Sequence, residues 1–183
     1  KLMKAGIFAT QGANELAQRV MNSVDADKAK LINQYWELQF YLAGRSNDLN
    51  QAREVVKAWN IQFPDSTRPN IALATYLEKA GQIEEAISVL EQVPHSLERR
   101  KESLALDAKL ASLYIYAGNL SKAKYKIGQI EKKPNLPSGL LDYLRGSYAI
   151  KQNNLDEAES LLAKAYRETS NSHTLKLLHV LNL

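Results

Sequence analysis

The residues of this chain that could carry chemistry are few, and most of them lie where helices are predicted to begin. Two adjacent pairs of carboxylates, Glu84 with Glu85 and Asp156 with Glu157, have the composition that general acid–base catalysis uses. Each pair directly follows a turn, in the first turn of a predicted helix, where negative charge complements the helix dipole. We therefore interpret both pairs as structural and expect no catalytic residue among them.

Metal and phosphate chemistry is also not indicated by the sequence. The three histidines, His95, His173 and His179, do not have metal-ligand spacing, and neither an HExxH motif nor a phosphate-binding glycine loop is present. The chain has no cysteine, which excludes disulfides and thiolate metal sites. We expect no metal, no cofactor and a binding protein rather than an enzyme.

The predicted helices that contain the acidic pairs begin with a sequence motif that occurs four times in the chain. Residues 48–52, 82–86, 119–123 and 154–158 each contain a polar turn residue, an apolar residue, two polar residues and an alanine. The alanines are 34, 37 and 35 residues apart (52 to 86, 86 to 123 and 123 to 158). Self-similarity at this interval is typical of arrays of helical hairpins.

Apolar residues on both sides of each turn recur every three or four positions, which places them on one face of a helix. Before the turns the predicted buried residues are Trp36, Phe40 and Ala43; Leu73, Ala74 and Leu77; Leu110, Ala111 and Tyr114; Gly146 and Ala149. After the turns they are Ala52, Val56 and Trp59; Ala86, Leu90 and Val93; Ala123, Ile127 and Ile130; Ala158, Leu162 and Ala165. The small members of each set predict close helix crossings.

Glycines and prolines mark the predicted helix ends. Gly44, Gly81, Gly118 and the pair Asn153 and Asn154 stand where the first helices should end in a left-handed conformation. The second helices should end before Pro64, Pro94 and Pro134, because proline cannot extend a helix from within. Ser96 is a predicted N-cap that lengthens the first helix of the third repeat.

The combined pattern resembles the tetratricopeptide repeat family. The residues that carry the resemblance are Trp36, Phe40, Ala43, Ala52, Trp59 and Pro64; Leu73, Ala74, Gly81, Ala86 and Leu90; Leu110, Ala111, Tyr114, Gly118 and Ala123; Tyr148, Leu155, Ala158 and Ala165. Gln39 and Arg145 depart from it, because the family usually has a large apolar residue there. The resemblance implies an all-α fold, a right-handed α-solenoid of antiparallel helix hairpins.

The expected organisation is one solenoid domain over residues 1–183, a length that can bury a continuous core. Residues 1–32 would form a degenerate hairpin or cap around Gly12 and Ala17, residues 33–172 four repeats, and residues 173–183 a capping helix or a truncated repeat. The chain begins at Lys1 without a methionine, so we expect a fragment or a processed form. The compartment, cytoplasm or bacterial envelope, stays open, as does the oligomeric state.

In this family the first helices of the hairpins line the concave groove, and the resemblance therefore implies a binding surface on them. A stripe of residues one position away from the buried face would form its floor. The stripe consists of Glu37, Tyr41, Arg45, Ile71, Thr75, Lys79, Ala108, Ser112, Tyr116, Tyr143, Ser147 and Lys151. Tyrosines among small and charged residues suit an extended or helical peptide of a partner protein. A scaffold in bacterial envelope assembly, secretion or exopolysaccharide export would use such a groove, and so would a peptide sensor.

Packing of the tyrosines between repeats is an equally good interpretation of that stripe. The lysine–asparagine clamp for a carboxy-terminal carboxylate is not expected, because Glu37, Tyr41, Ile71 and Ala108 occupy the groove positions. A competing hypothesis starts from the net charge of +4 and a basic cluster of Lys122, Lys124, Lys126, Lys132 and Lys133, with Arg99, Arg100 and Lys101 nearby. Such a surface could bind nucleic acid, anionic lipid or an acidic polysaccharide.

Overall fold

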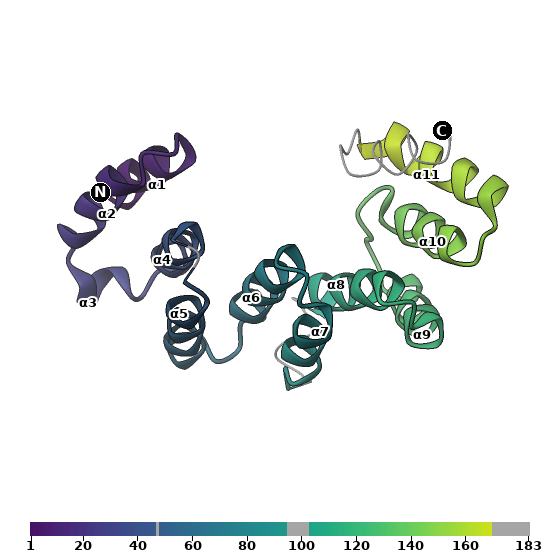
Figure 1. The fold of residues 1–183 in the computed structure, drawn as a ribbon, viewed down its shortest axis with the longest axis horizontal. Coiled ribbons are helices and arrows are strands. Elements are labelled where there is room, and N and C mark those ends of the chain that lie inside the picture. The colour runs from purple at the N-terminus through teal and green to yellow at the C-terminus, as the bar shows by residue number, and fades with distance from the viewer. Residues whose placement is uncertain (47, 95–102, 170–183) are drawn as a thin grey trace. The chain divides into compact units, whose positions relative to one another are not determined.

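A computed structural model describes residues 1–46, 48–94 and 103–169, and its regular elements over these residues are all helices (Figure 1). Their bounds are α1 Leu2–Thr10, α2 Asn14–Asn22, α3 Ala26–Ala29, α4 Asn33–Arg45, α5 Leu49–Gln62, α6 Arg68–Lys79, α7 Ile83–Glu91, α8 Ser103–Tyr116, α9 Leu120–Glu131, α10 Leu140–Lys151 and α11 Leu155–Thr169. The predictions for His95, Ser96, His173 and His179 and for the helix 173–183 concern residues outside the described ranges. Among the helices that are described, none has the length and apolar character that a membrane span requires.

The chain divides into two compact units, Lys1–Ala80 with helices α1 to α6 and Gly81–Leu183 with helices α7 to α11. In the first unit α1 packs on α2 and α4 on α5; in the second α8 packs on α9 and α10 on α11. The predicted second hairpin, α6 and α7, is divided between the units. A single domain over the whole chain stays a prediction.

All four repeated motifs begin a helix at their apolar residue, because α5, α7, α9 and α11 start at Leu49, Ile83, Leu120 and Leu155. The preceding polar residue caps two of these helices. A side-chain oxygen of Asp48 accepts a hydrogen bond from the backbone N–H of Gln51 at 2.9 Å, and Asn119 acts in the same way on α9. Such a cap satisfies a backbone donor that the first turn leaves unpaired.

The predicted buried faces are confirmed with one exception. Every residue of the two sets is buried, from Trp36 in α4 to Ala165 in α11, apart from Phe40, which is half-buried. Gly146 shows why small residues are needed: a Cβ built there would lie 2.7 Å from Cγ of Leu162. Helices α10 and α11 therefore approach closely at this point. The prolines that follow α5, α7 and α9 also lie beyond the helix ends, as predicted.

One predicted helix end is wrong. Gly81, Gly118 and Asn153 have positive φ angles of 77°, 75° and 60°, as expected for left-handed residues at the ends of first helices. Gly44 is the last residue but one of α4, which ends at Arg45, but it does not have the positive φ angle that was expected. A Cβ at Gly44 would lie 3.2 Å from the ring of Tyr76, so this glycine makes room for an aromatic side chain of α6.

The first unit has a core that runs from its first hairpin into α4. Ala5, Ala9, Ala17, Met21, Leu38 and Leu42 form one buried cluster. The turn between α1 and α2 contains Gly12, with a φ of 79°. The indole N–H of Trp36 donates to the backbone oxygen of Lys30 at 2.9 Å, and that of Trp59 to Oδ1 of Asn33 at 2.8 Å. These bonds fix the beginning of α4 and its pairing with α5.

Candidate functional site

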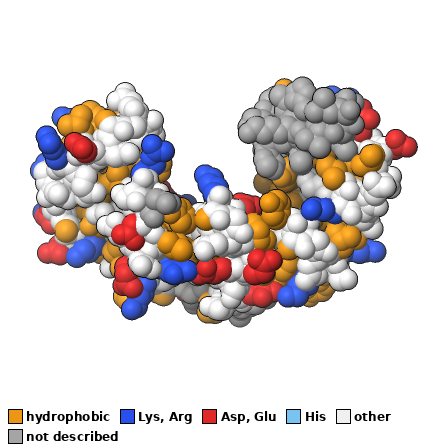
Figure 2. All heavy atoms as spheres, in the orientation of Figure 1, with side chains coloured by type: hydrophobic (Ala, Val, Ile, Leu, Met, Phe, Trp, Pro, Cys, Tyr) orange, Lys and Arg blue, Asp and Glu red, His pale blue; other side chains and the backbone are white. Residues whose placement is uncertain are grey.

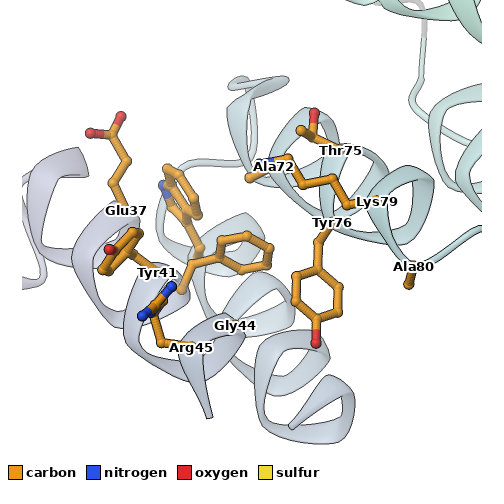
Figure 3. Close-up of a pocket in the computed structure, with 11 residues that line it drawn as sticks. Glu37, Tyr41, Gly44, Arg45, Ala72, Thr75, Tyr76, Lys79 and Ala80 are labelled. Atoms are coloured by element: carbon orange, nitrogen blue, oxygen red, sulfur yellow. The ribbon is translucent and has the colours of Figure 1, made fainter. Parts of the chain in front are cut away.

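Helices α1, α4 and α6 line the candidate binding surface of the first unit, and α4 packs against both of the others. A cavity of about 470 Å³ opens between α4 and α6. Five of the six stripe residues predicted for this unit line it, namely Glu37, Tyr41, Arg45, Thr75 and Lys79. Figure 3 shows the first three projecting from α4 and the other two from α6. Ile71, in the first turn of α6, is not among the lining residues.

Aromatic side chains form much of the cavity wall. Phe40, Trp59 and Tyr76 line it together with Tyr41, and the rings of Phe40 and Tyr76 meet nearly edge to face, with centroids 6.2 Å apart. The sequence pattern predicts Phe40 and Trp59 as core residues and assigns no role to Tyr76. Gly44 also lines the cavity, because it admits the Tyr76 ring. The site is therefore an apolar cavity with polar residues among its lining.

The charged residues of this cavity differ in how they are paired. Oε1 of Glu37 accepts a hydrogen bond from Nη1 of Arg68 at 3.3 Å. Arg45 and Lys79 are both exposed, and neither makes an ion pair or a hydrogen bond through its side chain with any residue that the structure describes. The one carboxylate in the lining is thus paired with a neighbouring arginine, whereas the two positive charges have no counterion among the described residues.

A second cavity, of about 450 Å³, lies on the other side of α4, against α1. Its lining is mostly apolar and includes Leu2, Met3, Ile7 and Leu38. Glu37 and Tyr41 line both cavities. The hydroxyl of Tyr41 donates to the backbone oxygen of Ala9 in α1 at 3.1 Å, while the residue stays 40% exposed. Tyr41 therefore lies between two adjacent cavities, and its hydrogen bond to Ala9 connects it to α1, which lines one of them.

In the second unit the stripe residues lie on two packed helices, Ser112 and Tyr116 on α8 and Tyr143, Ser147 and Lys151 on α10. The structure brings Tyr116 and Lys151 together, with Nζ of the lysine 5.6 Å from the centroid of the ring. Tyr116 is 62% exposed, whereas Tyr143 is half-buried. The hydroxyl of Ser147 donates to the backbone oxygen of Tyr143, within the same helix.

The basic cluster is largely paired within the protein. Lys126 and Lys133 donate to the two carboxylate oxygens of Asp107 at 2.7 Å and 2.6 Å, and Lys122 donates to Glu91 at 2.7 Å. Arg99, Arg100 and Lys101 are outside the described residues. On the face drawn in Figure 2, basic and acidic side chains of the described residues are interspersed. Three of the five lysines therefore hold helices together, which weighs against the anion-binding hypothesis.

The carboxylates that pair with these lysines have shifted pKa values. Burial acts to raise the pKa of Asp107, but the hydrogen bonds and charges of Lys126 and Lys133 together outweigh it, and the pKa lies below its ordinary value of 3.8. Hydrogen bonds from Lys122 and Tyr114 lower the pKa of Glu91. These shifts follow from ion pairing between helices, so they do not mark a catalytic site. Among the described residues no group of three or more His, Cys, Asp or Glu side chains could hold a metal.

Comparison with known proteins supports the fold and leaves the ligand open. No protein-family model matches the sequence, and no curated protein matches it. A solved tetratricopeptide repeat protein from Parabacteroides merdae is similar over all of this chain and 70% of its own, with a TM-score of 0.69 and 17% identity. The C-terminal part of a TPR repeat-containing protein from Cytophaga hutchinsonii is similar over 92% of this chain and 65% of its own, with a TM-score of 0.60 and 14% identity.

At these identities the likeness defines the fold. The chain has the all-α, tetratricopeptide-repeat-like fold of a helical-hairpin solenoid, and the resemblance seen in its sequence is confirmed.

Proposed function

We propose that the chain is a non-catalytic interaction scaffold that binds a peptide segment of a partner protein along α1, α4 and α6. The observation that carries the proposal is the convergence of five predicted stripe residues with aromatic side chains around one cavity, beside a second apolar cavity. Concave, mostly apolar sites with a few polar groups are the usual form of a binding site. Aromatic residues in such sites contribute much of the binding energy.

A peptide library tests this proposal with variants that fill the cavities. Gly6 lines the α1–α4 cavity, and a Cβ built on it meets nothing within 4 Å, so Gly6→Leu can occupy the cavity without disturbing the helix. Thr75→Trp would fill the α4–α6 cavity. Gly128→Leu is the matched control, because Gly128 lies on α9 in the second unit and also faces open space.

The expected result is that peptides selected on the wild-type protein from a phage-displayed random library lose binding to Gly6→Leu and Thr75→Trp and keep it to Gly128→Leu. Peptides that bind all three variants equally would show that neither cavity is the site. We further propose a role in a bacterial envelope, secretion or exopolysaccharide-export assembly. Affinity capture from the native organism with mass spectrometry tests that role, and partners confined to other processes would contradict it.

A further inference from the structure

The charges around the α4–α6 cavity favour one sign of ligand. Arg45 and Lys79 line the cavity from opposite helices and have no carboxylate partner among the described residues. Glu37, the carboxylate in the same lining, is paired with Arg68. Two like charges at an apolar cavity raise the positive potential there. A ligand that brings a negative charge next to an apolar group therefore matches this surface, and a basic ligand does not.

The distance between the two cavities also determines how far apart the apolar side chains of a bound peptide must be. They lie on either side of α4 and share Glu37 and Tyr41. Packed helices are about 8–10 Å apart, so neighbouring cavities between them are separated by roughly that distance. An extended chain covers this distance with about three residues. One peptide could therefore place two apolar side chains in the two cavities and pass over Tyr41 between them.

From these observations we propose that the first unit selects an acidic, extended segment of a partner protein with two apolar side chains about three residues apart. One apolar side chain enters the α4–α6 cavity and the other the α1–α4 cavity. Aspartate or glutamate side chains beside the first of them meet Arg45 and Lys79. This inference rests on the proposed function and adds the chemistry of the segment that is bound.

Three synthetic peptides test the selectivity. Each has Phe and Leu about three positions apart and an amidated carboxyl end, and the remaining positions are Asp, Ser or Lys. An exposed ion pair changes an affinity by roughly two- to fivefold, and two act together here, so the Asp peptide should bind roughly tenfold more tightly than the Ser peptide in fluorescence anisotropy. The Lys peptide should bind most weakly. Added salt should reduce these differences while the apolar contribution stays.

A charge reversal supplies the decisive variant. In the double variant Arg45→Glu and Lys79→Glu the order should invert, with the Lys peptide bound more tightly than the Asp peptide. The matched control is Arg19→Glu with Lys57→Glu, which changes the net charge equally at exposed residues of α2 and α5 outside both cavities. The control should keep the wild-type order. An inverted order also shows that the variant is folded, since an unfolded chain would bind neither peptide selectively.

The possible outcomes separate this inference from the function on which it rests. If the three peptides bind equally and lose binding to Gly6→Leu, the groove is the site and the acidic selectivity is wrong. If the Lys peptide binds the wild-type protein most tightly, or if the charge reversal leaves the order unchanged, the inference is also wrong. If none of the three binds and the library yields no peptide sensitive to Gly6→Leu or Thr75→Trp, both proposals fall.

Discussion

Replacing Gly146 by alanine tests the helix crossing on which the second unit depends. A Cβ at this position would lie 2.7 Å from Cγ and 3.0 Å from Cδ2 of Leu162, and 3.3 Å from the backbone oxygen of Ala158. Leu162 is fully buried, so its side chain would have to repack within the core to make room. Overpacking of this kind costs about 1–3 kcal/mol. Alanine is also the better helix former by about 1 kcal/mol, which offsets part of that cost.

The net expectation for Gly146→Ala is therefore a loss of about 0–2 kcal/mol in the free energy of unfolding. Gly128→Ala is the matched control within the same unit. Gly128 also lies inside a helix, but a Cβ there meets nothing within 4 Å. The helix-propensity gain is then unopposed, and Gly128→Ala should stabilise the protein by about 0.5–1 kcal/mol.

Urea unfolding followed by circular dichroism measures both variants against the wild type. The reasoning is refuted if the two substitutions raise the free energy of unfolding by the same amount. A double-mutant cycle sharpens the test, because Leu162→Ala removes the two closest atoms that an alanine at 146 would meet and leaves the backbone oxygen of Ala158 at 3.3 Å. In that background Gly146→Ala should no longer destabilise the protein.

Three further predictions concern other parts of the chain. The folded state lowers the pKa of Asp107 below 3.8, so the stabilisation by this carboxylate is present above that pH and is lost as the pH falls through the folded pKa. The difference in unfolding free energy between wild type and Asp107→Asn should therefore shrink below about pH 3.8. A difference that stays constant would contradict the ion-pair account. Ala86 is fully buried, so the larger side chain of Ala86→Leu should overpack the core. The free energy of unfolding should fall by about 1–3 kcal/mol, and the melting temperature should fall with it. A variant that melts like the wild type would show that Ala86 does not lie on the buried face. The sequence predicts that the binding stripe continues onto α8 and α10 of the second unit. On that prediction Tyr116→Ala and Tyr143→Ala should weaken capture of a partner and leave the helix content intact by circular dichroism, whereas unchanged capture by both would confine binding to the first unit.

The fold was predictable because its signals are local. A turn, a cap and a stripe of apolar residues every three or four positions are contained within one helix, and they located the starts of α5, α7, α9 and α11. The small residue at the crossing of α10 and α11 could also be predicted, since Gly146 lies in the apolar stripe of its helix. Such patterns do not need knowledge of which segments meet in space.

The errors and omissions concern contacts between segments that are distant in the sequence. Gly44 was interpreted as a helix end, but its role depends on Tyr76, which comes from another helix. The helical spacing of the apolar residues predicts Phe40 as a core residue. In the structure Phe40 is half-buried, because it lies at the edge of the buried face and lines the cavity. The pairing of the basic cluster was not predicted, because Asp107 lies on α8, whereas Lys126 lies on α9 and Lys133 follows the end of that helix.

Because Tyr41 lines both cavities, a ligand that moves this side chain on entering one cavity would affect binding in the other. Its hydroxyl donates a hydrogen bond to the backbone oxygen of Ala9 in α1, and the residue lines both cavities. A side chain that turns this ring in order to enter one cavity changes the shape of both, and the energetic cost of breaking the bond to Ala9 falls only on the first arrival. Thermodynamic linkage then requires the influence to be equal in both directions. The binding free energy of a segment with one anchor would then be less than half that of a segment with two anchors.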